Sequence, residues 1–446
     1  MVHVFLVGLL GLAIATPIRG LAAEPLGLLQ GYRLAIQNDH QLRAAQAQAS
    51  GVQESIEQAQ SRLGPQVNLS SSRYKLWQQR SDNGVQQPSQ NYVSENDGLS
   101  LRQPIYQPRL RAGLEQARYS GEGAMADLAD QRQALADRYT SAHVSLLLAQ
   151  EQLVLLTRQR ESTAVQLDAA KKAFAAGAGI RTDIDETQAQ LDRLDASLLQ
   201  ARQAVKLASF ELETLVGQAV LAGVTALSLQ RFDPAKVNPG PLESWLERAM
   251  RESPRLKSRL ARTQTAQVAA GAAKYDGYPT LDLIAQVTRS SSDDAYFVNS
   301  QSRSNAIGLS LTVPIYAGGA VSSRERQTAA ELTAAQEQQE QARKQIELQI
   351  RQQLFAVTEG IEMIAALEQA KRSADQALLA NVQSFRAGSR RSLDVLNAEQ
   401  RQLQAALDLS KARYQTLLAY IRLHVVAGVA NEDLMRQVNE WFAVGS

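Results

Sequence analysis

The nine residues GLSLRQPIY at 98–106 recur as GLSLTVPIY at 308–316, 210 residues later, with seven identical positions. A second pair of matching segments has nearly the same spacing, since FAAG at 174–177 returns as FRAG at 385–388. Matches in the same order at the same spacing indicate that one structural unit occurs twice in the chain. We therefore divide the sequence into a signal segment, a first repeat, a linker, a second repeat and a C-terminal segment, at 1–23, 24–216, 217–240, 241–427 and 428–446.

Each repeat contains a pair of predicted β-strands, preceded by roughly 35 to 40 residues rich in good helix formers. The helical stretch ends at Pro65 in the first repeat and at Pro279 in the second, because proline cannot continue a helix. Residues 305–315 alternate apolar and polar side chains, which predicts a strand with one apolar face. The first repeat alternates less clearly, and its strands are predicted from its match to the second repeat. Pro104 and Pro314 lie near the ends of the strand pairs, and at all four prolines we expect junctions between strand and helix.

The segments between the paired strands are dense in Ser, Asn, Asp and Gln and have no helical periodicity. We interpret these segments, 78–97 and 289–304, as exposed loops. Aromatic residues flank the predicted strands, as in the girdles of membrane-embedded sheets, although aromatic residues are common at any strand end. They are Tyr74, Trp77, Tyr106, Tyr278, Tyr296, Phe297 and Tyr316.

A helical tract of roughly 65 residues follows each strand pair, and at 1.5 Å per residue it would be about 100 Å long. The two tracts end at Gly177 and Gly388, and a second helix follows each glycine. In the last of these helices Leu396, Gln400 and Leu403 continue an alternating spacing of three and four residues, which is typical of a coiled coil. The sequence therefore predicts two long helical hairpins, whose length no globular domain requires.

The composition and motifs argue against an enzyme. The chain has 47 basic and 45 acidic residues and no cysteine, so neither a nucleic-acid partner nor thiolate chemistry is indicated. The four histidines, His3, His40, His143 and His424, are far apart and have no metal-ligand spacing. A Gly-rich phosphate loop and a nucleophile elbow are also missing from the sequence. We expect no catalytic residue, metal or cofactor.

The first residues resemble a secretory signal peptide, because 4–15 form an apolar run too short to span a bilayer. Cleavage after Ala15 and cleavage after Ala23 are both possible, and we favour Ala23, so that 1–23 is removed. Beyond residue 24 the sequence has no run of 18 apolar residues. If the mature chain enters a membrane, its strands have to cross it.

Four strands per chain are too few to close a barrel, since bacterial barrels begin at about eight strands. They also have no core of their own to cover their apolar face. The chain must therefore oligomerise, and a trimer would place twelve strands in one shared barrel. The predicted fold is mainly α with a small membrane β part, in which a long helical coiled-coil tube continues the barrel.

The repeated GLSLxxPIY segment, together with FxAG followed by an aspartate and a long helix, resembles the TolC family of outer-membrane efflux proteins over the whole mature chain. The resemblance implies a homotrimeric channel in the outer membrane lipid. Its helical tunnel would lie in the periplasm and dock with a periplasmic adaptor and an inner-membrane transporter of the ABC or RND type. Because it has no N-terminal cysteine, the chain is more similar to the unlipidated branch of the family, which serves type I protein secretion, than to the lipid-anchored drug-efflux branch. Drug efflux remains a second possible function. A soluble periplasmic coiled-coil scaffold is the alternative.

The resemblance also implies a periplasmic gate near the two hairpin turns. Asp183 and Asp394 would lie at the tip, where a ring of acids favours cations, and Arg390 could pair with Asp183 as a latch. Asn397 stands where the family often has a second acid, and Phe385 where it can have a tyrosine, which suggests a weaker latch. From the residues alone, Asp183 and Asp394 could equally be helix-capping acids, and Thr182 with Asp185 resembles a capping box.

The turns themselves are candidate docking points for an adaptor, because Gly177 and Gly388 would form the exposed end of the tube. A glycine that ends a helix in left-handed geometry explains the same residues without a partner. Both interpretations can hold together.

Overall fold

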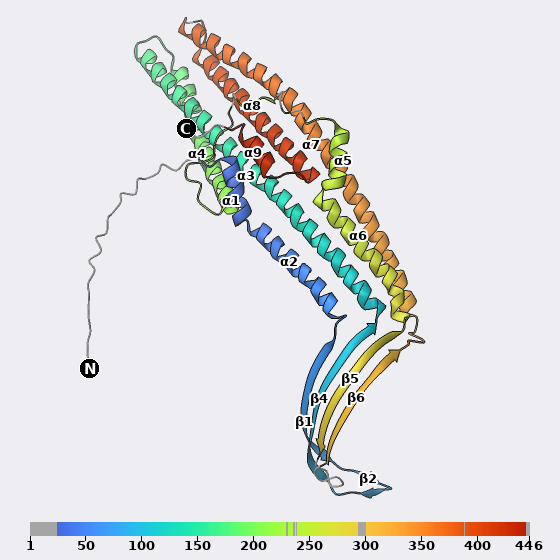
Figure 1. Ribbon diagram of the computed structural model, residues 1–446. Helices are drawn as coiled ribbons and strands as arrows, with labels where there is room; N and C mark the ends of the chain where they lie inside the picture. The colour runs from blue at the N-terminus through green and yellow to red at the C-terminus, as the bar shows by residue number, and fades with distance from the viewer. Residues whose placement is uncertain are drawn as a thin grey trace, which may run out of the picture.

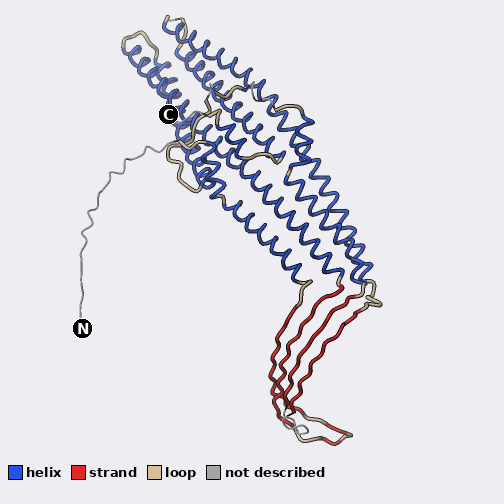
Figure 2. The backbone as a smooth tube through the Cα atoms, in the orientation of Figure 1, coloured by secondary structure: helices blue, strands red, loops and turns tan. Residues whose placement is uncertain are grey.

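A computed structural model shows an elongated molecule, with a helical bundle at one end and a four-stranded sheet at the other (Figures 1 and 2). The structure describes residues 25–228, 231–234, 237, 239–292, 300–387 and 389–442. The predicted signal peptide, Tyr296, Phe297 and Gly388 lie outside these described residues.

The elements follow one another in the same order in the two halves of the chain. The first half contains α1 (Leu28–Asn38), α2 (His40–Ser61), β1 (Gln66–Gln78), β2 (Ser81–Asp82), β3 (Val85–Gln86), β4 (Gln90–Tyr106), α3 (Pro108–Ala175) and α4 (Arg181–Val216). The second half contains α5 (Leu242–Glu252), α6 (Pro254–Ala272), η2 (Ala273–Gly277), β5 (Thr280–Ser292), β6 (Ser300–Thr312), α7 (Ala320–Arg386), α8 (Ser392–Ala427) and α9 (Glu432–Asn439).

The single opening helix expected in each repeat is instead two helices. Asp39 has an extended backbone, with φ −64° and ψ 118°, and its carboxylate accepts a hydrogen bond from the Leu42 N–H at 2.6 Å. Ser253 adopts nearly the same backbone angles before Pro254, which opens α6. An N-cap and a helix-opening proline therefore outweigh the high helix propensity of the surrounding residues.

The four long strands form one antiparallel sheet in the order β1-β4-β5-β6, so the strand pairs of the two halves meet at β4 and β5. Its apolar residues line up across neighbouring strands: Val67 lies opposite Leu101, which lies opposite Ala285, which lies opposite Ile307. This face is uncovered in the single chain, where Ile307 is 78% exposed. An apolar sheet face of this size requires lipid or another chain against it.

The strands are longer than the sequence indicated, since β4 begins at Gln90 and β5 extends to Ser292, inside the segments interpreted as loops. Polar cross-strand contacts extend the pairing there, including Ser71 to Asp97 at 2.7 Å. Polar residues on both faces remove the alternation on which strand prediction depends. The connecting segment contains a tight hairpin at Asn83 and Gly84, whose φ angles are 54° and 82°.

The four prolines lie close to the end of the sheet that adjoins the helices, but not all lie at a junction. Pro65 and Pro279 directly precede β1 and β5. Pro314 lies between the end of β6 and the start of α7. Pro104, in contrast, lies inside β4 opposite Asp282, where the register shifts, and the change to helix comes later, at Gln107.

The two tracts expected after the strands are confirmed as helices of 68 and 67 residues, α3 and α7. Each turns back into a 36-residue helix, α4 or α8. The two hairpins run side by side to the end of the molecule opposite the sheet (Figure 1). None of the helices in the described part of the chain combines the length and hydropathy needed to cross a membrane.

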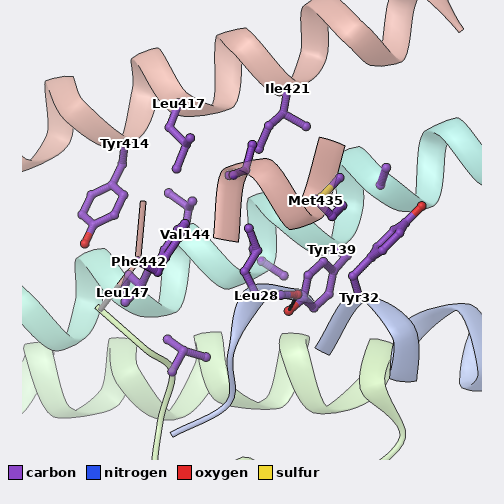
Figure 3. Packing of buried hydrophobic residues seen from close by; sticks show 14 of the residues in the cluster. Leu28, Tyr32, Tyr139, Val144, Leu147, Tyr414, Leu417, Ile421, Met435 and Phe442 are labelled. Atoms are coloured by element: carbon purple, nitrogen blue, oxygen red, sulfur yellow. Dashed lines mark hydrogen bonds between the residues drawn. The ribbon is translucent and has the colours of Figure 1, made fainter. Parts of the chain in front are cut away.

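The main core lies midway along the bundle, where α1, α3, α4, α8 and α9 meet (Figure 3). Tyr139 is fully buried at its centre, and its hydroxyl donates to the Leu28 carbonyl at 2.9 Å. The linker and the C-terminal segment are part of this core, because Leu227 pairs with Phe442 in an isolated β-bridge. Met435 of α9 is also fully buried. This core therefore joins the two halves of the chain.

Candidate functional site: the hairpin turns and the seam behind them

The turn between α3 and α4 is closed by backbone hydrogen bonds. Gly177 has φ +73°, a left-handed conformation that favours glycine, and its N–H donates to the Phe174 carbonyl at 3.0 Å. The Ala178 N–H donates to the Ala173 carbonyl at 2.9 Å. This pattern is that of a helix ended by a left-handed glycine, so the local role of Gly177 is to end α3.

Gly179 is a second required glycine that the sequence interpretation missed. A Cβ atom there would lie 2.9 Å from the Phe174 backbone nitrogen, closer than real Cβ contacts allow. The spacing Gly177-Ala178-Gly179 was the available signal. In the other turn, the Ser389 N–H donates to the Ser384 carbonyl at 2.9 Å, which is equivalent to the bond from Ala178 to Ala173 in the first turn.

Asp183 lies in the first turn of α4 and is half-buried. The capping box predicted for Thr182 and Asp185 is wrong, because α4 already begins at Arg181 and its N-cap is Ile180. Asp185 instead forms an exposed ion pair with Arg181 at 3.3 Å. Asp183 is placed where a carboxylate complements the positive end of the helix dipole.

Asp394 occupies the equivalent position in α8 and takes part in a hydrogen-bonded cap. Its Oδ2 accepts from the Arg391 backbone N–H at 3.2 Å, and its own N–H donates to the Arg391 carbonyl at 3.1 Å. Like Asp183, Asp394 is half-buried. The capping interpretation therefore accounts for its contacts within one chain.

The remaining gate candidates lie on the surface of the single chain. Arg390, Asn397 and Phe385 are exposed, Phe385 by 42%. Within the residues that the structure describes, Arg390 forms no ion pair with Asp183, so the two are not brought together inside one chain. The latch and the acidic ring concern contacts between chains and stay predictions.

Large apolar side chains are exposed at both turns. Phe174 and Ile180 are 44% and 56% exposed at the first turn, and Phe385 and Leu393 are 42% and 41% exposed at the second. Because the ends of both hairpins lie far from the sheet and from the core (Figure 1), this surface is accessible to another protein. Exposed apolar groups of this kind are typical of interaction sites.

Behind the turns, the two hairpins are joined by hydrogen bonds between α3 and α8. The carboxylate of Glu399 on α8 is 7% exposed and accepts three bonds from α3. The donors are Gln166 Nε2 at 2.6 Å, Ser162 Oγ at 2.7 Å and Gln159 Nε2 at 3.0 Å. Burial raises the pKa of Glu399, while the three donors act in the opposite direction.

The sequence interpretation missed Glu399 because it placed the coiled-coil seam through Gln400. In the structure Gln400 is exposed and Glu399 is buried. The helix must serve two partners, since α8 packs on α7 within its hairpin and on α3 across hairpins. The signal was a glutamate one helical turn from both Leu396 and Leu403.

Further from the tip, the same α3 to α8 seam contains two more polar contacts. The Tyr414 hydroxyl donates to Glu151 at 2.7 Å, and Arg422 pairs with Asp137 at 2.7 Å. Desolvation and the nearby Glu151 carboxylate both raise the pKa of Tyr414. The seam between the hairpins is thus polar at three levels.

The described residues contain no group of three His, Asp or Glu side chains close enough to hold a metal ion. His143 is fully buried between Tyr139 and Phe442, and burial lowers its pKa to about 3, so it is neutral at physiological pH. It serves the core.

Comparison with known proteins agrees with this arrangement. The family model for outer membrane efflux proteins matches residues 31–218 and 245–429. The protease secretion protein PrtF of Dickeya chrysanthemi is 30% identical over 97% of this chain and 94% of its own length. The alkaline protease secretion protein AprF of Pseudomonas aeruginosa is 31% identical over 95% of this chain and 89% of its own.

Solved structures share the fold. The CmeC outer membrane channel of Campylobacter jejuni superposes with a TM-score of 0.78 at 16% identity, covering 93% of this chain and 89% of that one.

Proposed function

The chain belongs to the outer membrane efflux protein family and is an outer-membrane export channel, and we propose that the cargo it exports is protein, by type I secretion. The observation that carries this proposal is the similarity to PrtF and AprF, both named for protease secretion, over nearly the whole chain. The family consists of transport channels. A duct of this kind performs no chemistry on its cargo.

We propose a homotrimer in which the edge strand β1 of one chain pairs with β6 of the next. Each chain contributes four strands, so three chains close a barrel of twelve. The apolar face, with Val67 and Ile307, would contact outer membrane lipid. Strands of 13 or more residues exceed the 9 to 11 or so that a tilted strand needs to cross a membrane.

The helices would continue the barrel into the periplasm, with the hairpin turns at the far end. The exposed apolar groups at Phe174, Ile180 and Phe385 support this end as the docking point for a periplasmic adaptor. The adaptor would connect the channel to an inner-membrane transporter of the ABC type. The gate proposed for Asp183, Arg390 and Asp394 would form only when three chains bring these exposed or half-buried groups around one axis.

A replacement experiment tests the proposal. Cells of Dickeya chrysanthemi that lack PrtF would receive this chain, and extracellular protease activity would be measured. We expect protease in the medium, with none released by a matched variant in which residues 174–180 are replaced by a Gly-Ser loop. Correctly inserted trimer without secreted protease, but with increased resistance of the cells to small toxic compounds, would favour drug efflux instead.

Channel activity has its own test. Detergent-extracted protein should have the native mass of a trimer and produce discrete openings in a planar bilayer. A water-soluble species without conductance would exclude the channel and favour a periplasmic scaffold.

A further inference from the structure

Glu399 is a buried acid whose hydrogen-bond partners, among the described residues, all lie on the other hairpin. The three donors, Gln159, Ser162 and Gln166, all belong to α3 and approach the carboxylate within 3.0 Å. Glu399 is also close to the tip, seven residues after Ser392, where α8 begins, or about 10 Å along the helix. A contact at this height is in a position to hold the ends of the two hairpins together.

We propose that Glu399 is a positioning residue that fastens the α7/α8 hairpin to α3 and holds the tip closed, so that the channel opens only when its three hydrogen bonds break. The inference rests on the proposed function, because a gate has meaning only in a channel. It differs from the latch discussed above, which involves exposed groups at the turns.

The energetics of the contact suit a joint that opens. Hydrogen bonds to a charged acceptor are the stronger kind, so three of them give the closed state a well-defined geometry. The same cluster is incompletely satisfied, since within the described residues Thr163 Oγ1 and Gln166 Oε1 are buried without a hydrogen-bond partner. A partly satisfied polar network is less favourable than an apolar core. The hairpins are therefore held specifically but not tightly.

Within the described part of the chain, Glu399 forms no ion pair, and two basic groups on the same hairpins have other partners. On the first hairpin, Arg160 of α3 pairs with Asp195 of α4 at 2.8 Å. On the second, Lys371 pairs with Asp375 of α7 at 2.7 Å. The bonds of Glu399 that the structure describes all come from neutral donors. Opening would return the carboxylate to water, which lowers the cost of breaking these bonds.

The apolar packing behind Glu399 explains where the movement would end. Leu403, one helical turn further from the tip, packs on the cluster formed by Leu156, Leu194 and Leu198. A hairpin released at Glu399 would therefore remain anchored by Leu403. We expect the tip to open by a rotation of the end of the α7/α8 hairpin about this cluster.

Single-channel recording of the purified trimer tests the proposal. Glu399→Ala should lengthen the open dwell time about tenfold or more, the loss expected when bonds to a charged acceptor are removed. Glu399→Gln keeps an acceptor oxygen and should largely restore the wild-type dwell time. Asp195→Ala is the matched control, because it removes a carboxylate at a similar height whose partner lies in the same hairpin. It should gate like wild type.

A cross-link tests the same idea without weakening the fold. The chain has no cysteine, so Ser162→Cys/Glu399→Cys can be joined specifically by a short, reductively cleavable bis-maleimide. The linked trimer should stay closed and regain openings after cleavage. Linked protein that opens normally would overturn the proposal, as would an open dwell time in Glu399→Ala equal to that of Asp195→Ala. A wild-type protein that conducts nothing would instead refute the proposed function.

Discussion

The ion pair between Arg102 and the buried Asp282 should stabilise the point where the sheet becomes the helical bundle. Asp282 has a side-chain exposure of 10% and accepts from Arg102 Nε at 3.1 Å, from Arg102 Nη2 at 2.7 Å and from Gln107 Nε2 at 2.8 Å. The pair joins β4 to β5, the two central strands, so it lies within one chain whatever its neighbours are.

Arg102→Met would leave the Asp282 carboxylate buried with only the neutral Gln107 as a donor. Removing one member of a buried pair costs about 3 to 5 kcal/mol. Arg102 itself is 54% exposed, so solvent screens part of the interaction, and we expect a loss of about 2 to 3 kcal/mol. That corresponds to roughly a 30- to 150-fold shift in the folding equilibrium.

The matched control is Arg73→Met, because Arg73 pairs with Glu95 in the same sheet at 3.0 Å with side-chain exposures of 75% and 46%. An exposed pair contributes about 0 to 1 kcal/mol. The temperature at which half of the purified trimer dissociates in detergent would be measured for both variants. We expect a clear decrease for Arg102→Met, partly recovered in Arg102→Met/Asp282→Asn. Equal behaviour of the two single variants would refute the reasoning.

Three further predictions concern the tip. Asp394→Ala should reduce the cation selectivity of the channel, and an unchanged reversal potential under a salt gradient would contradict an acidic ring. Burial raises the pKa of Glu399 in the docked state, so protonation favours docked hairpins. This stabilisation is complete below the pKa of an exposed carboxyl and is lost as the pH rises through the raised pKa. The open dwell time should therefore increase over this pH range in the wild type and stay constant in Glu399→Gln. Gly177→Ala places a methyl group at φ +73°, which should cost about 1 kcal/mol and speed amide exchange in the turn, with Gly113→Ala as an unhindered control.

The overall architecture could be predicted from the sequence because its signals are long and repeated. The duplicated segments at 98–106 and 308–316 identified the strands of the weaker half from those of the stronger. The tracts of good helix formers predicted α3 and α7 nearly to their full length. Such patterns average over many residues, so single exceptions do not disturb them.

The features that the sequence did not reveal depend on single residues or on contacts between distant segments. The break at Asp39 depends on one side chain that caps α2, and at 3% exposure it also pairs with Arg138 at 3.2 Å. The outer parts of β4 and β5 are mostly polar and carry no sustained alternation. Glu399 is buried only because α8 meets α3, which is some 240 residues distant from it in the sequence. A periodicity along one helix cannot identify which of two partner helices each residue contacts.

The repeat also makes the position of Glu399 informative. Its equivalent in the first half is Gln188, which bonds to Asp192 within its own helix at 2.8 Å. The residues of α7 equivalent to the three donors are Ala370, Ser373 and Ala377, of which only the serine keeps a side-chain donor.

In the proposed trimer, α4 of one chain would meet α7 of the next, and that seam would lack an acid at the position equivalent to Glu399. The six seams of the tunnel would therefore alternate between two kinds. Those within a chain are held by hydrogen bonds to a charged group, whereas at the equivalent level between chains Gln188 replaces the acid and alanine replaces two of the three donors. The free energy of opening should accordingly differ between the two kinds of seam, and substitution of Glu399 should change it only at the seams within a chain.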